Sequence, residues 1–327
     1  MKAPPYLLVL LLSLLPALQA PAAPGDSDVR WTAGAADCAA NAPPPLQVHA
    51  YDARTFILRQ DPCAHFEANF LYLLLGQDRA LLIDSGAVAE PGRMPLAATV
   101  RDLLLREGRP MLPLLVAHTH GHGDHRAGDA QLAALPSTQV VPTDTDGMRA
   151  FFGFDAWPEG AATIDLGGRI VDVIPAPGHH PDHVLFHDRR TALLFTGDFL
   201  LPGRLLVDDL AAYRDSAGRA VAHFRGRPVS QVLGGHVELD ARGDAYPHGA
   251  THHPDERPLA LSRADLAALP GALADFNGFY SRHAHFIVVD PMHMLAAAGA
   301  VALLLAVLAG WGLVRLLRRR RRRRALR

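Results

Sequence analysis

The chain has little lysine and little cysteine. Lys2 is its only lysine, and we attach no function to this, because biased codon usage explains it. Cys38 and Cys63 are its only cysteines, which limits the chain to one internal disulfide. An oxidising compartment would permit that bond. Two free or buried thiols are the alternative, since the sequence does not give the distance between the cysteines.

Positive charge is scarce once the two ends are set aside. The whole chain has 32 Lys and Arg against 33 Asp and Glu, but Lys2 and the nine arginines from Arg315 onward lie at the ends. The remaining part holds 22 cations against 33 anions, a net charge of about −11. An acidic domain repels the phosphate backbone, so we expect no nucleic-acid partner.

The apolar run at the N-terminus is too short to span a bilayer comfortably. It covers residues 6–15 behind Lys2, and small residues follow up to Ala23. This pattern is typical of a secretory signal peptide, which we place at residues 1–22, with cleavage after Ala22 or Ala23. An uncleaved anchor is the alternative interpretation.

A longer apolar run is found near the C-terminus. Residues 294–314 are uncharged and mostly apolar, and at about 1.5 Å per residue they cover the roughly 30 Å hydrocarbon core of a bilayer. The arginine run 318–324 follows, and dense cations beside a span mark the cytoplasmic side. We therefore predict a transmembrane helix at 294–317, an Arg-rich cytoplasmic tail at 318–327 and a body on the periplasmic side. A nucleic-acid-binding tail is the alternative for the arginines.

The remaining chain alternates between strand-like and helix-like segments. Residues 23–45 are rich in Ala, Pro and Gly and predict a flexible leader, and an ordered catalytic domain is expected at 46–290. Strands are predicted at 69–75, 80–84, 114–117, 169–174, 184–187, 192–196 and 229–233, and helices at 96–107, 124–135 and 210–224. A capping box at Ser262–Asp265 predicts one more helix, interrupted at Pro270. Two similar halves of this kind favour two sheets flanked by helices.

The densest chemical signal is a histidine-rich run that follows the predicted strand 114–117. It reads His118-Thr-His-Gly-His-Gly-Asp-His125. Histidine is the commonest neutral ligand of zinc, and the glycines let neighbouring imidazoles leave one tight loop. The pair Asp124-His125 adds ligands that face another direction, so one loop can serve two adjacent cations. A solvated loop or an adventitious metal binder is the alternative.

Residues 119–125 resemble the Thr-His-x-His-x-Asp-His signature of the metallo-β-lactamase superfamily. Other segments match that family in the same order, namely Asp84-Ser-Gly86, Pro177-Gly-His179, Phe195-Thr-Gly-Asp198 and Leu233-Gly-Gly-His236. The match covers about residues 46–240. It implies an α/β fold, the four-layer αββα sandwich of that family.

The resemblance also implies a site for two divalent metal ions. His120, His122 and His179 would hold the first ion. Asp124, His125 and His236 would hold the second, and Asp198 would bridge both. Asp84 would support the ligands from behind. Zn²⁺ is the expected metal, with Fe and Mn as alternatives.

Several other histidines compete for these roles. The turn Pro177-Gly178 favours His179 over His180 and His183, and a strand followed by two glycines favours His236. The rivals of His236 are His223, His248, His252 and His253. His118 is expected behind the ligands, with a role at the site left open. His180, His183, His187 and the later histidines are expected to be solvated or locally hydrogen-bonded.

The implied reaction is hydrolysis of a small molecule by a metal-bridging hydroxide, with Asp124 orienting the nucleophile or passing a proton to the leaving group. Asp198 resembles the bridging Asp of the glyoxalase II, lactonase and phosphodiesterase branches. An ester, thioester or lactone is therefore the expected substrate, and β-lactam hydrolysis is disfavoured because lactamases of the superfamily lack this Asp. Only about 55 residues separate His236 from the predicted span, too few for the glutathione-binding domain of glyoxalase II.

Two further classes remain as alternatives. An iron-dependent, persulfide-dioxygenase-like oxidoreductase would keep the same histidine motif. A noncatalytic metal-binding membrane protein would be expected to lose ligands, which this sequence does not. Residues 202–204 and 246–258 are candidate substrate loops. The oligomeric state cannot be read from the sequence.

Overall fold

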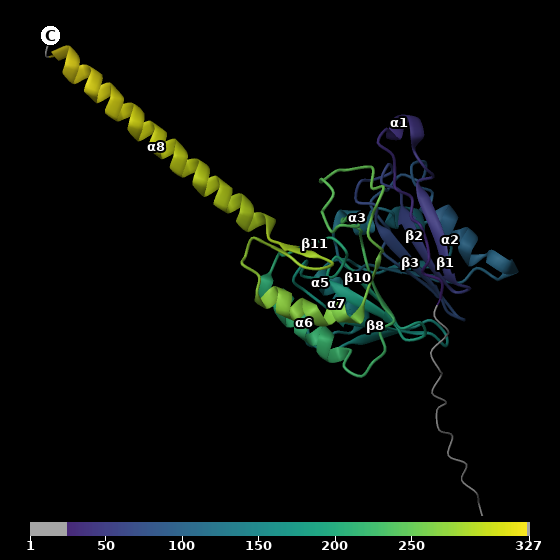
Figure 1. Cartoon of the computed structure of the whole chain (residues 1–327). Coiled ribbons are helices and arrows are strands. Elements are labelled where there is room, and N and C mark those ends of the chain that lie inside the picture. Colours follow the sequence, from purple (N-terminus) through teal and green to yellow (C-terminus); the bar gives the residue numbers. More distant parts are fainter. Residues whose placement is uncertain (1–24, 326–327) are drawn as a thin grey trace, which may run out of the picture.

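Two six-stranded sheets pack face to face in the computed structural model, which describes residues 25–325 (Figure 1). The first sheet has the strand order β1 (Leu46–Asp52), β2 (Thr55–Gln60), β3 (Phe70–Leu75), β4 (Ala80–Ile83), β5 (Leu114–Ala117) and β6 (Thr138–Val140). The second has the order β13 (Ala260–Leu261), β12 (Gln231–Gly234), β10 (Leu193–Gly197), β9 (Val184–Asp188), β8 (Ile170–Pro175) and β7 (Ala162–Asp165). The predicted signal peptide at 1–22 lies outside the described residues.

The sheets form the two inner layers of a four-layer sandwich. Alternate side chains of β3 face opposite ways, as a two-residue period requires: Phe70, Tyr72 and Leu74 pack between the sheets, while the intervening leucines face outward. The outer face of the first sheet is covered by α2 (Leu96–Leu104) and α4 (Asp129–Ala133). The outer face of the second is covered by α6 (Leu210–His223) and α7 (Arg263–Ala274). The αββα fold class predicted from the sequence is confirmed.

Short elements complete the described chain. They are α1 (Cys38–Asn41), the 3₁₀ turn η1 (Arg106–Gly108), α3 (Gly123–Arg126) and α5 (Thr145–Phe152). A third, small sheet has the order β11 (Arg204–Leu206), β15 (Ile287–Val289) and β14 (Tyr280–Arg282). Its central strand β15 leads through Asp290 into the last helix.

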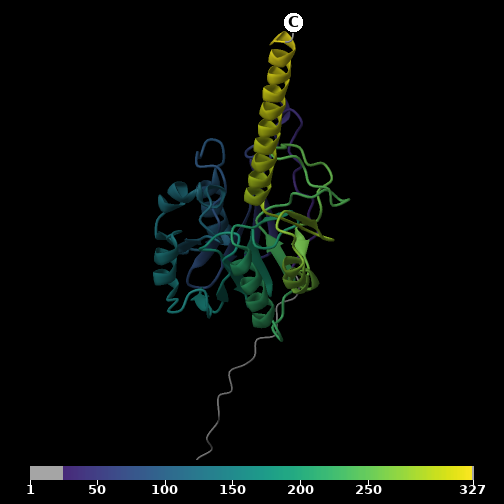
Figure 2. The same cartoon turned by 90° about the vertical axis from the view of Figure 1, so that its left-hand side faces the viewer.

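That last helix, α8 (Pro291–Ala325), leaves the folded body and shares no extensive contact with it (Figures 1 and 2). Its part 291–316 is long and apolar enough to cross a membrane. Asp290 caps its first turn, because the Asp290 carboxylate accepts a hydrogen bond from the His293 backbone N–H at 2.9 Å. The transmembrane helix predicted at 294–317 falls inside this helix.

Two predicted helices differ from the structure. The helix predicted at 124–135 is broken into α3 and α4, because the Ala127 N–H donates to the Gly86 carbonyl at 2.9 Å. The prediction that Pro270 interrupts its helix is wrong: α7 starts at the Ser262 capping box and continues through Pro270. A proline removes one hydrogen bond. The burial of Leu269 and other apolar side chains of α7 outweighs that loss.

The structure differs from the flexible leader predicted at 23–45 over the part that it describes. Trp31 packs edge-on against Phe70, with ring centroids 5.0 Å apart. Cys38 and Cys63 form a disulfide with a Cα–Cα distance of 5.4 Å. The disulfide that the sequence left open is thus formed in the structure, and it links this segment to the first sheet's loop after β2.

Candidate metal centre

The seven predicted ligands lie where four strands end at one edge of the sandwich. The loop and short helix α3 after β5 carry the first four, and His179 follows β8, Asp198 follows β10 and His236 follows β12. In the second sheet, β10 pairs parallel with β12, and β8 runs in the same direction because both β8 and β10 are antiparallel to β9. Ligands far apart in the sequence therefore meet at a single edge.

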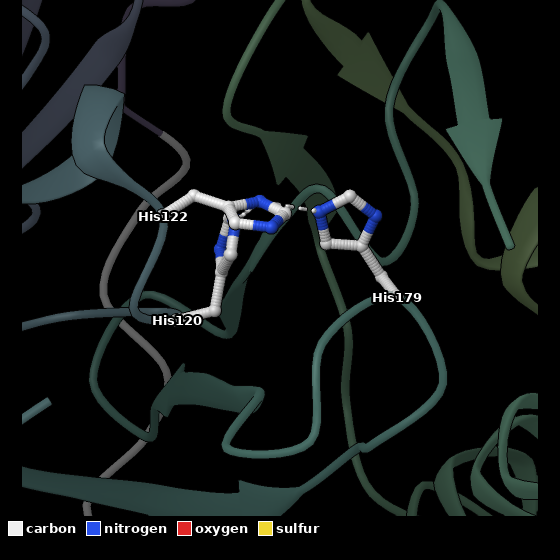
Figure 3. A group of neighbouring side chains, drawn as sticks. All are labelled: His120, His122 and His179. Atoms are coloured by element: carbon white, nitrogen blue, oxygen red, sulfur yellow. Dashed lines mark hydrogen bonds between the residues drawn. The ribbon is translucent and has the colours of Figure 1, made fainter. Parts of the chain in front are cut away.

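One cluster consists of three imidazoles whose nitrogens converge (Figure 3). The His122 Nδ1 atom lies 2.9 Å from the His120 Nε2 atom and 3.2 Å from the His179 Nε2 atom. His120 and His179 are buried, whereas His122 stands at the rim. The loop after β5 and the Pro-Gly turn after β8 thus place three nitrogens around one point.

A second cluster lies beside the first and is built by Asp124, His125 and His236. The Asp124 Oδ2 atom is 3.3 Å from the His125 Nε2 atom and 3.4 Å from the His236 Nε2 atom. The two Nε2 atoms are themselves 3.3 Å apart. Asn69 also reaches this cluster, with its side-chain nitrogen 3.2 Å from the Asp124 Oδ2 atom.

Asp198 lies between the two clusters. Its Oδ1 atom is 3.4 Å from the His125 Nε2 atom and 3.3 Å from the His236 Nε2 atom, while its Oδ2 atom is 3.6 Å from the His179 Nε2 atom. The Oδ1 atom is buried and has no hydrogen-bond partner among the described residues. A buried carboxylate oxygen without a hydrogen bond is costly, and a cation would satisfy it.

The hydrogen bonds of His179 and His236 give these rings the tautomer that a metal ligand needs. The Nδ1 atoms of His179 and His236 face the carbonyl oxygens of Leu206 and Glu67, at 3.0 and 2.7 Å. Carbonyls only accept hydrogen bonds, so each Nδ1 carries the proton and each Nε2 presents a lone pair to the centre in the neutral ring. Lone pairs that face one another at these distances repel, and a shared cation removes that repulsion. The donor set therefore fits a metal centre.

Asp84 holds the second cluster from behind. Its Oδ2 atom accepts a hydrogen bond from the His125 Nδ1 atom at 2.9 Å, which leaves the His125 Nε2 atom free for the centre. Its Oδ1 atom accepts one from the Thr119 backbone N–H at 2.8 Å. Asp84 is itself in the left-handed region, with φ of 63°. The supporting role predicted for it agrees with these contacts, because such carboxylates fix the tautomer of a ligand.

Carboxylates dominate the electrostatics next to Asp198. Burial alone would lower the pKa of His125 and His236, but Asp198 and the neighbouring carboxylates outweigh burial and raise both pKa values. Burial would raise the pKa of Asp198, but His236 and His125 hold it well below its usual range. In the other cluster, burial lowers the pKa of His120 strongly and that of His179 to about 4. The carboxylates thus favour positive charge at the second cluster, whereas burial disfavours it at the first.

Two glycines make this close approach feasible. A Cβ atom on Gly235 would lie 2.6 Å from the Asp198 Oδ1 atom and 2.9 Å from the His125 ring. A Cβ atom on Gly197 would lie 2.4 Å from the Thr119 hydroxyl, and Gly197 has a φ of 48°. The turns before Asp198 and His236 therefore need glycine for lack of space.

The competing histidines have other surroundings. The His118 Nε2–H donates to the Asp129 carboxylate at 2.8 Å behind the loop, and His180 pairs with Asp182 near the rim. His187 is bonded to Asp172 and Pro228. Our expectation that His183 is solvated or hydrogen-bonded is wrong. The ring is buried and stacks on His120, and neither nitrogen has a hydrogen-bond partner among the described residues. It packs as an aromatic spacer behind the first cluster.

A pocket of about 300 Å³ opens above the centre. Its wall includes five of the predicted ligands and, beyond them, Glu67, Leu201, Arg204, Leu206, Glu238 and His248. The candidate substrate loop 202–204 reaches this pocket through Arg204, and the loop 246–258 reaches it through His248. Sequence reasoning missed Asn69, Glu67 and Glu238, which belong to no recognisable motif.

Comparisons with known proteins agree with this centre. The model of the metallo-beta-lactamase superfamily matches residues 66–273. The hydroxyacylglutathione hydrolase of Anaeromyxobacter dehalogenans (strain 2CP-C) is 30% identical over 235 residues, which cover 72% of this chain and 85% of that protein. The chain belongs to the metallo-β-lactamase superfamily. The family model includes every predicted ligand from His120 to His236.

The chain is also similar to two other known proteins over part of its length. The atrochrysone carboxyl ACP thioesterase of Passalora fulva is 30% identical over 169 residues, covering 49% of this chain and 47% of that protein. The solved metallo-beta-lactamase from Pontibacter korlensis has 16% identity and a TM-score of 0.47, over 71% of this chain and 100% of that one. The relatives from A. dehalogenans and P. fulva are named as a hydrolase and a thioesterase, and this superfamily member is likewise an enzyme, a metallo-hydrolase.

Proposed function

We propose that the chain is a dinuclear metallo-hydrolase that cleaves an ester, thioester or lactone. The observation that carries the proposal is Asp198, whose two carboxylate oxygens face the two clusters. His120, His122 and His179 would hold one ion, and Asp124, His125 and His236 the other. Nitrogen and carboxylate ligands suit Zn²⁺.

Such ions lower the pKa of a bound water and polarise a carbonyl group. The chain would supply the remaining parts of the reaction. Asp124 is only partly buried, contacts the centre and lines the pocket, so it is the group placed to accept a proton and return it to the leaving alcohol or thiol. Asn69 holds the Asp124 carboxylate through its amide nitrogen. Glu67 would fix His236 through its backbone carbonyl.

The charge of the pocket wall supports an uncharged substrate. Beside the ligands, the wall carries Glu67 and Glu238, and its arginine, Arg204, is paired with Glu238 at 3.1 Å. No unpaired arginine or lysine among the described wall residues is left to bind a phosphate or carboxylate of the substrate. Thioesters of glutathione or of acyl carriers, which are the substrates named for the relatives, carry such negative charge. An uncharged ester or lactone fits this wall better.

The location of the enzyme is part of the proposal. We infer that α8 anchors the chain in a membrane, with the catalytic domain on the periplasmic side and the arginines 318–324 on the cytoplasmic side. The length and hydropathy of residues 291–316 support the anchor, and the arginines support the orientation.

The test is a hydrolase screen on the full chain in detergent, loaded with Zn²⁺. It would include a lactone, an ester, a thioester, a phosphodiester and a β-lactam. We expect turnover of the first three groups, and loss of at least about 10³-fold in Asp198→Ala. Asp146→Ala is the matched control, because the Asp146 side chain is 94% exposed. Equal turnover in Asp198→Ala and the control would reject the proposed centre.

A further inference from the structure

The wall of the catalytic pocket and the stem of α8 form one hydrogen-bonded unit. Strand β11 pairs in parallel with β15, with Leu206 opposite Val289. The next residue, Asp290, caps α8. On the other side of β11, the Leu206 carbonyl accepts a hydrogen bond from the His179 Nδ1 atom at 3.0 Å, and Leu206 also lines the pocket.

This connection fixes the height of the pocket above a membrane that α8 would cross. The apolar part of α8 begins at Pro291, directly after Asp290. A helix rises about 1.5 Å per residue, so the first apolar turn starts only a few Å beyond β15. Because Leu206 lies one strand away from Val289, about 5 Å, the pocket wall would lie at the level of the lipid headgroups if α8 crosses the bilayer.

Exposed apolar side chains gather at the three-stranded sheet next to α8. Before α8, five large apolar side chains of the described residues are exposed: Val48, Leu105, Leu206, Phe279 and Tyr280. Leu206 belongs to β11, and Phe279 and Tyr280 lie at the start of β14, in the same three-stranded sheet. The Phe279 carbonyl accepts a hydrogen bond from the Asp290 N–H at 3.1 Å, so the aromatic pair is next to the first turn of α8.

The arrangement in space is consistent with a membrane at this corner. Figure 1 shows α8 leaving the body beside β11, with the folded domain on one side of its first turn. Aromatic side chains next to a membrane span favour the headgroup region. The exposed side chains on this corner therefore match a lipid surface in chemistry and position.

We propose that the pocket opens onto the bilayer that α8 crosses and takes a lipophilic ester or lactone from it. This inference rests on the proposed hydrolase and its membrane anchor. The apolar chain of the substrate would stay in the bilayer, while its carbonyl group enters past Leu206. The oxygen of water then adds to the carbonyl carbon, and the bond between that carbon and the leaving oxygen breaks. The leaving oxygen takes the proton that the water has lost, which gives an acid and an alcohol.

Two matched esters in vesicles test the substrate. The full chain is reconstituted in phosphatidylcholine vesicles, and 4-methylumbelliferyl palmitate is placed either in the same vesicles or in separate ones. We expect hydrolysis of the palmitate to be at least about tenfold faster in the same vesicles, because a long acyl chain leaves a bilayer slowly. The soluble butyrate ester serves as the control and is expected to react equally in both arrangements.

A site-directed spin label tests the position without using activity. Tyr280→Cys carries the label near α8, and Leu105→Cys carries it at the C-terminal end of α2. Collisions with oxygen should dominate for the first label, and collisions with a water-soluble nickel chelate for the second. Hydrolysis of butyrate with no preference for co-reconstituted palmitate, or a Tyr280→Cys label that is as accessible to nickel as the Leu105→Cys label, overturns the inference and leaves the hydrolase intact. Hydrolysis of neither ester overturns both.

Discussion

The His125 imidazole donates its Nδ1–H to the Asp84 carboxylate at 2.9 Å, in the interior of the protein. This contact decides which nitrogen of His125 faces the centre. We expect Asp84→Asn to weaken metal binding by about 10- to 100-fold, as is typical when the partner of a ligating histidine is changed. Competition with a fluorescent chelator measures the effect, and Asp146→Asn is the exposed control. Unchanged affinity would show that Asp84 has a purely structural role.

The lack of space at Gly235 predicts a second effect. In Gly235→Ala the new methyl group would meet the Asp198 carboxylate and the His125 ring at under 3 Å. We expect loss of the second metal ion with little loss of helix or strand content, because the clash is confined to the centre. Gly218→Ala, at a helical position with open space around it, is the control. Metal analysis measures the loss of the ion, and far-UV circular dichroism checks that the helix and strand content is retained.

Asp172 predicts how stability depends on pH. Burial alone would raise its pKa, but hydrogen bonds from His187 and Arg189 lower the pKa to about 2. A depressed carboxyl pKa stabilises the fold above the unfolded value of about 3.9 and loses that effect as the pH falls through the folded value. We therefore expect Asp172→Asn to reduce the free energy of unfolding by about 1–2 kcal/mol at pH 7.

The effect of Asp172→Asn on the free energy of unfolding should disappear in acid. Chemical denaturation at several pH values would show the two chains converging between pH 4 and pH 2. A difference that stays constant down to pH 2 would mean that packing, and not the charge of Asp172, explains the loss.

The disulfide predicts a further stability effect. Cys38 and Cys63 are 25 residues apart, and closing a loop of this size stabilises a fold by about 3 kcal/mol. We expect the double variant Cys38→Ser/Cys63→Ser to lose that amount of unfolding free energy, and therefore to unfold at a lower denaturant concentration. Turnover should change little, because the bond lies outside the centre. A reducing agent should affect the native chain and leave the variant unchanged.

Much of the centre could be predicted because its residues sit at strand ends. The strand at 114–117 has the predicted bounds, and it delivers the histidine run directly to the edge of the sheet. The turns before His179 and His236 carry glycines that mark close approaches, so the structure brings these two histidines, and not their neighbours, to the centre. Local patterns were sufficient wherever the determining contacts are local.

The rest depends on contacts between distant segments. Asn69 reaches Asp124 across 55 positions of the chain, and nothing in the residues around Asn69 predicts this. The break at Gly128 arises because Ala127 bonds to Gly86, a neighbour only in the folded chain. His183 is buried beside the rings of His120 and Phe199, which are distant from it in the sequence. Single-residue patterns contain no information on such packing.

Counting the metal ions tests the central claim most directly. The purified full chain is dialysed against Zn²⁺, freed of loosely bound metal and analysed by mass spectrometry, beside His120→Ala and His236→Ala. We predict two ions per chain, one per chain in each variant, and loss of turnover when a chelator removes them. A native chain with no bound metal, or two ions retained in both variants, would contradict a centre built by these two clusters.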